Sequence, residues 1–307
     1  MDTELPRFEE GRLASLVQAL DPGARLIRYW PLTGGVSAQT TALEIERANA
    51  GKRKLVLRAH GSRDVARDPD IAQHEFQLLE ALSNAGLPVP RPVHVVDAGG
   101  ASLACQAVVV EFVEGEIAPS PASLTGYVAE MARWLAQIHA FDLASHDLGF
   151  LVSNEYQAAH LFETRPDDSD LVRSICQTVA RVGPTELRND PVLLHGDFWQ
   201  GNLLWRDGRI VAILDWEDAM IGDPIIDLAR SRLELHWMHG ELARERFTSH
   251  YLSWNDIDVD SLPFWDLAMA LRLSRDLPGW RLPPEREQEM MSALEQFVEQ
   301  ATEQLAP

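Results

Sequence analysis

Cysteine is scarce in this chain of 307 residues, where only Cys105 and Cys176 occur. Two cysteines cannot form a disulfide framework or a zinc site built on cysteine, and they indicate a reducing compartment. No run of about 18 apolar residues is present, so a transmembrane helix is not expected. The first residues, Met1 to Glu4, lack the basic and apolar regions of a signal peptide. We therefore expect a cytoplasmic protein with no membrane partner.

Basic residues are also few, because 27 Lys and Arg stand against 47 Asp and Glu, a net charge of −20. Nucleic acid is bound by clustered Lys and Arg, so this class of partner is excluded. The acidity is uneven: residues 1–115 carry 12 basic and 15 acidic side chains, and residues 116–307 carry 15 and 32. The second half either has a solvated acidic surface or receives a cation, such as a metal ion or an amine.

Several nucleotide and metal motifs are missing. No G-x-x-x-x-G-K-[ST] segment occurs, which excludes a P-loop NTPase, and there is no G-x-G-x-x-G segment. Neither His-Glu-x-x-His nor His-x-His occurs, although a metal-dependent hydrolase would need paired histidine ligands. Such a hydrolase is therefore the third-ranked function.

The spacing of apolar and turn residues predicts a β-rich first part and a mostly helical second part. The segment 119–122, Pro-Ser-Pro-Ala, is the best boundary between them. Strands are expected at 24–32, 36–46, 52–60, 92–97, 103–113, 192–194, 203–205 and 210–214, and helices at 7–20, 70–82, 124–141, 155–182 and through most of 225–304.

Two neighbouring segments concentrate groups that suit phosphate chemistry. The first is 195–202 (HGDFWQGN), and the second contains Asp215 and is followed by Gly-Asp-Pro-x-x-Asp, which ends at Asp227. One carboxylate, Asp197, can accept a proton from a hydroxyl, while Asn202 and Asp215 offer the hard oxygen ligands that Mg²⁺ prefers. A single Asp–Asn pair is ordinarily turn or capping chemistry. The whole string together favours a metal–phosphate site.

These segments resemble the aminoglycoside phosphotransferase and choline kinase-like family, relatives of protein kinases, over nearly the whole chain. The resemblance implies an α+β, bilobal protein-kinase-like fold. A small antiparallel β-sheet lobe, 1–115, would bind nucleotide, and a mostly helical lobe, 116–307, would carry the catalytic loop and the acceptor. It implies Asp197 as the catalytic base and Asn202 and Asp215 as Mg²⁺ ligands. His195 and Asp227 would support the site structurally.

The resemblance also implies a cationic side chain that binds the nucleotide phosphates. The chain's two lysines, Lys52 and Lys54, do not fall where the family's nucleotide lysine usually sits, whereas Arg58 does. A guanidinium binds phosphate well, so the exchange is chemically sensible. Glu75 is its expected partner, and Glu80 is a rival on another face of the same helix.

Two further segments would complete the nucleotide site. The turn that contains Gly34, Gly35 and Ser37 would cover the phosphates with backbone N–H groups, although a Gly-Gly pair is also an ordinary hairpin turn. The adenine edge would bond the carbonyl of Glu111 and the amide of Val113.

The interval from Asp215 to Gly222 is too short for a long activation loop, which favours a small-molecule acceptor. Acidic groups and indole faces suit an amine or quaternary ammonium, whereas indoles alone suit a macrolide-like molecule. The candidate acceptor contacts are Trp199, Glu217, Asp218 and Glu234.

The expected function is an ATP- and Mg²⁺-dependent O-phosphotransferase, with GTP an open alternative as donor. The acceptor would be a hydroxyl of an aminoglycoside-, macrolide-, choline- or homoserine-like molecule, and antibiotic resistance is one candidate role. The alternative is a nucleotide-binding pseudokinase or regulatory module. The sequence leaves the oligomeric state undetermined.

Overall fold

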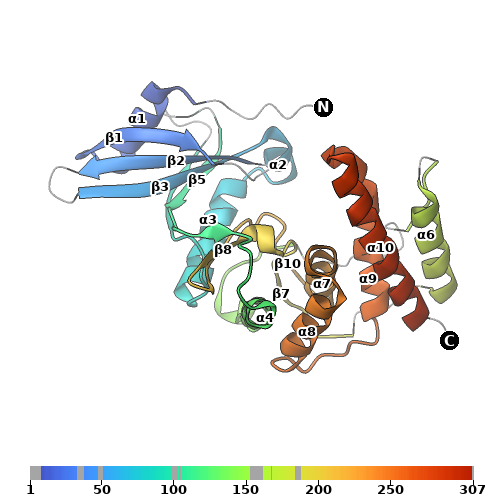
Figure 1. The fold of residues 1–307 in the computed structure, drawn as a ribbon. Helices are drawn as coiled ribbons and strands as arrows, with labels where there is room; N and C mark the ends of the chain where they lie inside the picture. The colour runs from blue at the N-terminus through green and yellow to red at the C-terminus, as the bar shows by residue number, and fades with distance from the viewer. Residues whose placement is uncertain are drawn as a thin grey trace. The chain divides into compact units, whose positions relative to one another are not determined.

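The computed structural model describes residues 8–32, 38–47, 51–97, 103, 105–152, 162–166, 168–183 and 188–305 (Figure 1). The chain divides into two compact units. The first comprises Met1–Ile117 with Leu203–Arg206 and Ile210–Leu214, and the second comprises Ala118–Asn202, Asp207–Arg209 and Asp215–Pro307. Among the described residues, no helix combines the length and the apolar character that a membrane crossing needs.

The first unit is built on a five-stranded antiparallel sheet in the order β1-β2-β3-β5-β4. A second, three-stranded sheet has the order β6-β8-β9. Their strands are β1 (Ala24–Pro31), β2 (Ala38–Arg47), β3 (Gly51–His60), β4 (Pro92–Val96), β5 (Ala107–Glu111), β6 (Glu116–Ile117), β8 (Leu203–Arg206) and β9 (Arg209–Ile213).

Side chains of β3 alternate between the two faces of the sheet, so that one face forms the core of this unit and the other carries Arg58. Leu55 and Leu57 are buried against Leu13 and Leu16 of α1 (Glu10–Leu20), which covers this face of the sheet (Figure 1). Because successive side chains of a strand point to opposite faces, Arg58 lies on the other face. There the helix α3 (Ile71–Asn84) packs on β4 and β5, after the short α2 (Ser62–Arg67).

The second unit is mainly helical. Its centre is α7, which is buried along most of its length and contacts α8, α9 and α10. A short antiparallel pair, β7 and β10, precedes this helix in the chain. The elements are α4 (Leu124–His139), η1 (Leu143–Ser145), α6 (Asp170–Val182), β7 (Val192–Leu194), η2 (Gln200–Asn202), β10 (Met220–Gly222), α7 (Ile225–His239), α8 (Glu241–Leu252), α9 (Leu262–Asp276), η3 (Leu277–Trp280) and α10 (Pro284–Gln304).

The predicted strands and long helices are present with shifted ends, and the short elements α2, β6, β10, η1, η2 and η3 were not predicted. The helix predicted over 155–182 is wrong at residues 162–166 and 168–169, which are not helical, whereas residues 155–161 lie outside the part of the chain that the structure describes. Ser169 begins α6 as an N-cap whose side chain accepts a hydrogen bond from the amide of Val172. Such a cap fixes the first turn of a helix.

The core of the first unit yields a stability prediction. Ile45 keeps 4% of its surface exposed, whereas Ile117 keeps 48%. Ile45→Ala should lower the free energy of unfolding by about 2–5 kcal/mol, because it leaves a cavity between α1 and the sheet. Ile117→Ala, the matched control, should change it by less than about 0.5 kcal/mol. Urea unfolding of both variants measures this, and equal losses would contradict the assignment of the core.

Candidate functional site

The loop that joins β7 to β8 carries the predicted catalytic residues, and its shape depends on Gly196. This residue has a φ of +80°, and a Cβ placed on it would lie 2.2 Å from the carbonyl oxygen of Asp218. Only glycine fits such a position without moving the neighbouring backbone. The ring of His195 is fully buried, and its centroid lies 4.5 Å from the ring of Trp216. The loop therefore has one tightly packed side.

Asp227, in the first turn of α7, is joined to this loop. Its Oδ2 accepts a hydrogen bond from the amide of His195 at 2.7 Å, and its Oδ1 accepts one from the amide of Gly196 at 2.9 Å. His139 Nε2 lies 3.3 Å from Oδ2, and Nδ1 of the same ring lies 2.6 Å from the hydroxyl of Tyr251. Burial alone would raise the pKa of Asp227, but the hydrogen bonds and charges of His139 and His195 lower it on balance. Asp227 is thus a buried anion that fixes the loop to a helix.

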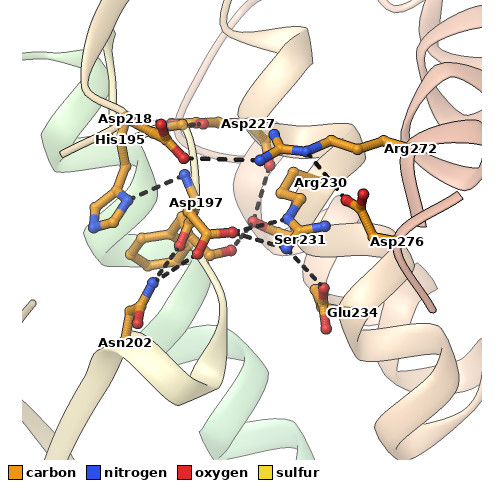
Figure 2. A network of polar contacts seen from close by, with 12 residues as sticks. His195, Asp197, Asn202, Asp218, Asp227, Arg230, Ser231, Glu234, Arg272 and Asp276 are labelled. Carbon is orange, nitrogen blue, oxygen red and sulfur yellow. Dashed lines mark hydrogen bonds and ion pairs between the residues drawn. The ribbon is translucent and has the colours of Figure 1, made fainter. Parts of the chain in front are cut away.

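Asp197 and Asn202 lie side by side in the loop (Figure 2). Asn202 Nδ2 donates to Asp197 Oδ2 at 3.0 Å and to the main-chain oxygen of Asp197, also at 3.0 Å. The Asp197 side chain is 25% exposed, so a substrate can reach it. Among the described residues, Asn202 Oδ1 accepts no hydrogen bond. This amide oxygen suits a hard cation.

Arg230 on α7 is a candidate site residue that was not predicted from the sequence. Its Nε and Nη2 lie 3.1 and 2.8 Å from Asp197 Oδ1, so the guanidinium grips one carboxylate oxygen with two donors. Its Nη2 also lies 3.1 Å from Oε1 of Glu234, and Oε2 of Glu234 accepts a hydrogen bond from Trp237 at 2.6 Å. Arg230 and Glu234 follow Asp227 by three and seven residues, which places all three on one face of a helix. This spacing is the feature of the sequence that could have predicted Arg230.

Burial and charge oppose one another in this cluster. Burial would lower the pKa of Arg230, but the carboxylates of Glu234, Asp197 and Asp218 raise it on balance, so the guanidinium stays charged. Burial raises the pKa of Glu234, and Arg230 and the hydrogen bond from Trp237 offset this only in part. The cluster is a chain of alternating charges that begins at Asp197.

Asp215 follows β9 and has a φ of +64°, in the left-handed region that few residues other than glycine adopt. Such conformations persist where the surrounding structure holds them, and they are common at functional sites. No group of three or more His, Cys, Asp or Glu side chains within the described part of the chain could hold a metal ion. An amide and a carboxylate oxygen are ligands that suit Mg²⁺, which usually keeps several waters and binds phosphates, and the assignment of Asn202 and Asp215 to this role stays a prediction.

The four predicted acceptor contacts have varied surroundings. The ring of Trp199 packs over Gly201, where an added Cβ would lie 2.3 Å from a ring carbon. Glu217 and Asp218 are half-buried, and Asp218 Oδ2 lies 3.8 Å from Nη2 of Arg272. Glu234 keeps only 2% of its surface exposed. Contact between these side chains and an acceptor stays a prediction.

In the first unit, the structure brings Arg58 and Glu75 together. Arg58 Nε lies 3.2 Å from Glu75 Oε1, and His60 Nε2 lies 3.0 Å from Glu75 Oε2. Burial would raise the pKa of Glu75, but Arg58 and His60 lower it on balance. The rival, Glu80, is exposed. His60 was not singled out in the sequence, although it shares the β3 face of Arg58.

The remaining nucleotide candidates lie at the end of β5 or outside the described residues. Glu111 is the last residue of β5, and its amide donates to the carbonyl of Arg91 at 2.9 Å. Val113 follows two residues later and is half-buried. Gly34, Gly35 and Ser37 fall outside the part of the chain that the structure describes.

Sequence comparison identifies a family and several relatives. The model of the phosphotransferase enzyme family matches residues 30–265. Acyl-CoA dehydrogenase family member 11 of Pongo abelii is 26% identical over 234 residues, which are 64% of this chain and 29% of that protein. Acyl-CoA dehydrogenase family member 10 of Mus musculus is 28% identical over 200 residues, 59% of this chain and 18% of that protein. The chain thus spans less than a third of the length of these relatives.

Solved structures share the fold at low identity. A protein of Ralstonia eutropha JMP134 gives a TM-score of 0.71 at 19% identity, covering 97% of this chain and 98% of that one. APH(4)-Ia with ADP and hygromycin B gives 0.64 at 16% identity, covering 96% and 99%. APH(2")-IIIa with GDP and kanamycin gives 0.67 at 19% identity, covering 94% and 97%. The predicted kinase-like α+β fold is confirmed.

The brace from Asp227 can be tested by one substitution. Asp227→Asn keeps the shape but places an amide against three donors, so it should lower the free energy of unfolding by about 3 kcal/mol. Because the folded pKa of Asp227 is lowered, its contribution is present at neutral pH and is lost as the pH falls below about 4. Urea unfolding at pH 7 and pH 3 measures both effects.

The matched control for this test is Asp260→Asn, since the side chain of Asp260 is 77% exposed. This variant should keep the pH dependence of the wild type. If Asp227→Asn also kept the wild-type stability at pH 7 and its loss in acid, Asp227 would not brace the loop.

Proposed function

Because the chain belongs to the phosphotransferase enzyme family, we propose that it transfers the γ-phosphate of ATP to a hydroxyl group of a small molecule. The observation that carries the proposal is the pair of Asp197 and Asn202, joined at 3.0 Å in a loop that Asp227 braces. A partly exposed carboxylate beside an amide oxygen suited to a cation is the arrangement that phosphoryl transfer to an alcohol requires.

Asp197 would act as the base. Its carboxylate accepts the proton of the acceptor hydroxyl and orients the oxygen for in-line attack on phosphorus. Arg230 and Asn202 hold this carboxylate from two sides, which fixes its direction. Asn202 Oδ1 and Asp215 would hold Mg²⁺, which supplies charge neutralisation at the phosphates. Positioning and charge, rather than covalent chemistry, would lower the barrier.

Arg58 would contact the nucleotide phosphates in the first unit. Glu75 fixes the direction of Arg58 through the 3.2 Å ion pair, and His60 steadies Glu75 from its other oxygen. Glu111 and Val113 would offer a carbonyl and an amide to the base, and the turn with Gly34, Gly35 and Ser37 would cover the phosphates. Similar folds hold ADP or GDP, which supports a purine nucleotide as donor and keeps GTP as an alternative to ATP.

The acceptor would be a hydroxyl compound similar in size to the molecules bound in the solved structures of similar fold. Structures of similar fold hold hygromycin B and kanamycin, so aminoglycosides belong in the first panel, together with macrolides, choline and homoserine. Growth of a host in the presence of these antibiotics would test a resistance role. A pseudokinase would be expected to lack a catalytic carboxylate or a metal ligand, whereas this chain retains Asp197, Asn202 and Asp215.

Loss of the base should slow transfer strongly and spare nucleotide binding. Asp197→Asn keeps the size of the side chain but cannot accept the proton, so kcat should fall by about 10²–10⁴-fold. Acceptor-dependent ADP release measures turnover, and calorimetry with Mg–ATP measures binding. Asp207→Asn, in the exposed turn between β8 and β9, is the matched control and should retain full turnover. Turnover at the wild-type rate in Asp197→Asn would exclude Asp197 as the base.

Substitutions that remove or keep the charge of Arg58 test its role in nucleotide binding. Arg58→Gln should raise the KM for ATP by about tenfold or more, because a charge-assisted contact to phosphate is lost. Arg58→Lys should recover part of this affinity, since a lysine also binds phosphate as a point charge. Arg25→Gln, at an exposed ion pair on β1, is the control and should leave KM unchanged. An unchanged KM in Arg58→Gln would place the phosphates elsewhere.

A further inference from the structure

Two arginine side chains take part in the polar network around the proposed base: Arg230 contacts Asp197, and Arg272 lies beside Asp218. Figure 2 shows Arg230 and Arg272 reaching toward the loop of Asp197 from α7 and α9. The acidic residues proposed to attract a cationic acceptor are their partners, since Glu234 pairs with Arg230 and Asp218 with Arg272. An incoming ammonium group would have to displace an arginine from each of these two carboxylates.

Arg230 has donors to spare. Its Nε and Nη2 contact Asp197 and Glu234, whereas Nη1 has no partner among the described residues. The side chain keeps 11% of its surface exposed. A guanidinium carries five N–H donors in a fixed plane, so the two on Nη1 are available to a ligand that lies next to Asp197.

Arg272 is the more exposed and less committed of the two. Its Nη2 lies 3.8 Å from Asp218 and its Nε lies 4.0 Å from Asp276, and the side chain is 40% exposed. Exposed ion pairs at such distances contribute little, so Arg272 can turn toward a ligand at small cost. Its charge acts on Glu234, whose pKa it lowers against the larger effect of burial. Arg272 therefore belongs to the same electrostatic cluster as Arg230.

From these contacts we propose that the acceptor carries an anionic group, a carboxylate or a phosphate, near the hydroxyl that is phosphorylated. Arg230 Nη1 and Arg272 bind this group, and the hydroxyl then lies at Asp197. This inference rests on the proposed phosphotransferase function and makes its acceptor a hydroxy acid or a phosphorylated alcohol. Arg230 has two roles, because it orients the base and binds the acceptor.

Matched acceptors test the charge directly. D-Gluconate, D-gluconamide and D-glucamine share one polyol chain and differ in carrying a carboxylate, an amide or an ammonium group. Sorbitol 6-phosphate against sorbitol tests phosphate in the same way. With the full chain and Mg–ATP, calorimetry should show at least one of the two anions binding about tenfold tighter than its neutral counterpart. The anion that binds identifies the group.

The arginine variants assign that preference to residues. Arg272→Gln, on an exposed side chain that does not touch Asp197, should raise KM for the anionic acceptor about tenfold and leave kcat unchanged. Arg230→Gln should lower kcat as well, because the base loses its clamp. Arg246→Gln on α8, which pairs with Thr125, is the matched control and should behave as the wild type. If Arg230→Gln fails to fold, Arg272→Gln carries the test.

Several outcomes would overturn the inference: neither anion binds, a neutral or ammonium acceptor binds as tightly as the anion, or the preference survives in Arg272→Gln. Transfer to neutral or cationic acceptors alone would contradict the anionic acceptor but support the phosphotransferase function. Binding of an anion that depends on Arg272, with no ADP release from any acceptor, would support the anionic site and contradict the proposed function.

Discussion

The buried carboxylate of Asp227 is the constraint on which the candidate site depends. It accepts hydrogen bonds from the amides of His195 and Gly196, so the start of the catalytic loop is fixed to the first turn of α7. One and two turns later, the same helix presents Arg230 and Glu234. A single helix therefore supplies the brace of the loop, the clamp on Asp197 and the counter-ion of that clamp.

Ion pairs with arginine account for part of the acidic residues of the second unit. Part of the negative charge of the second unit is paired inside it: Arg232 binds Asp266 in a buried ion pair, and Arg275 binds Asp168. A buried carboxylate is costly unless a cation and hydrogen bonds satisfy it. The excess of acid is therefore not by itself an acidic surface for an amine, because Asp197 and Glu234 are paired with Arg230, and Asp218 lies beside Arg272.

Site residues could be predicted where they form a local pattern in the sequence, and not where their roles depend on contacts between segments that are far apart in the chain. Asp197, Asn202 and Asp215 could be proposed from the sequence because their spacing is a local pattern along one chain segment, and the fold class followed from the resemblance that they carry. Arg230 and His60 were missed, because their roles arise from contacts between elements: a helix face against a loop, and a strand against a helix. The start of α6 was misplaced for a local reason, the cap at Ser169, which apolar spacing does not record.

The central claim is that a phosphoryl group passes from ATP to a hydroxyl. Phosphorus NMR of the full chain with Mg–ATP and the acceptor panel tests it most directly, because it identifies the product that receives the phosphate. The account predicts that the γ-phosphate signal declines while a phosphate monoester signal, coupled to a proton of the alcohol carbon, grows in step. Inorganic phosphate as the sole product, or ATP that stays intact with every acceptor, would contradict it.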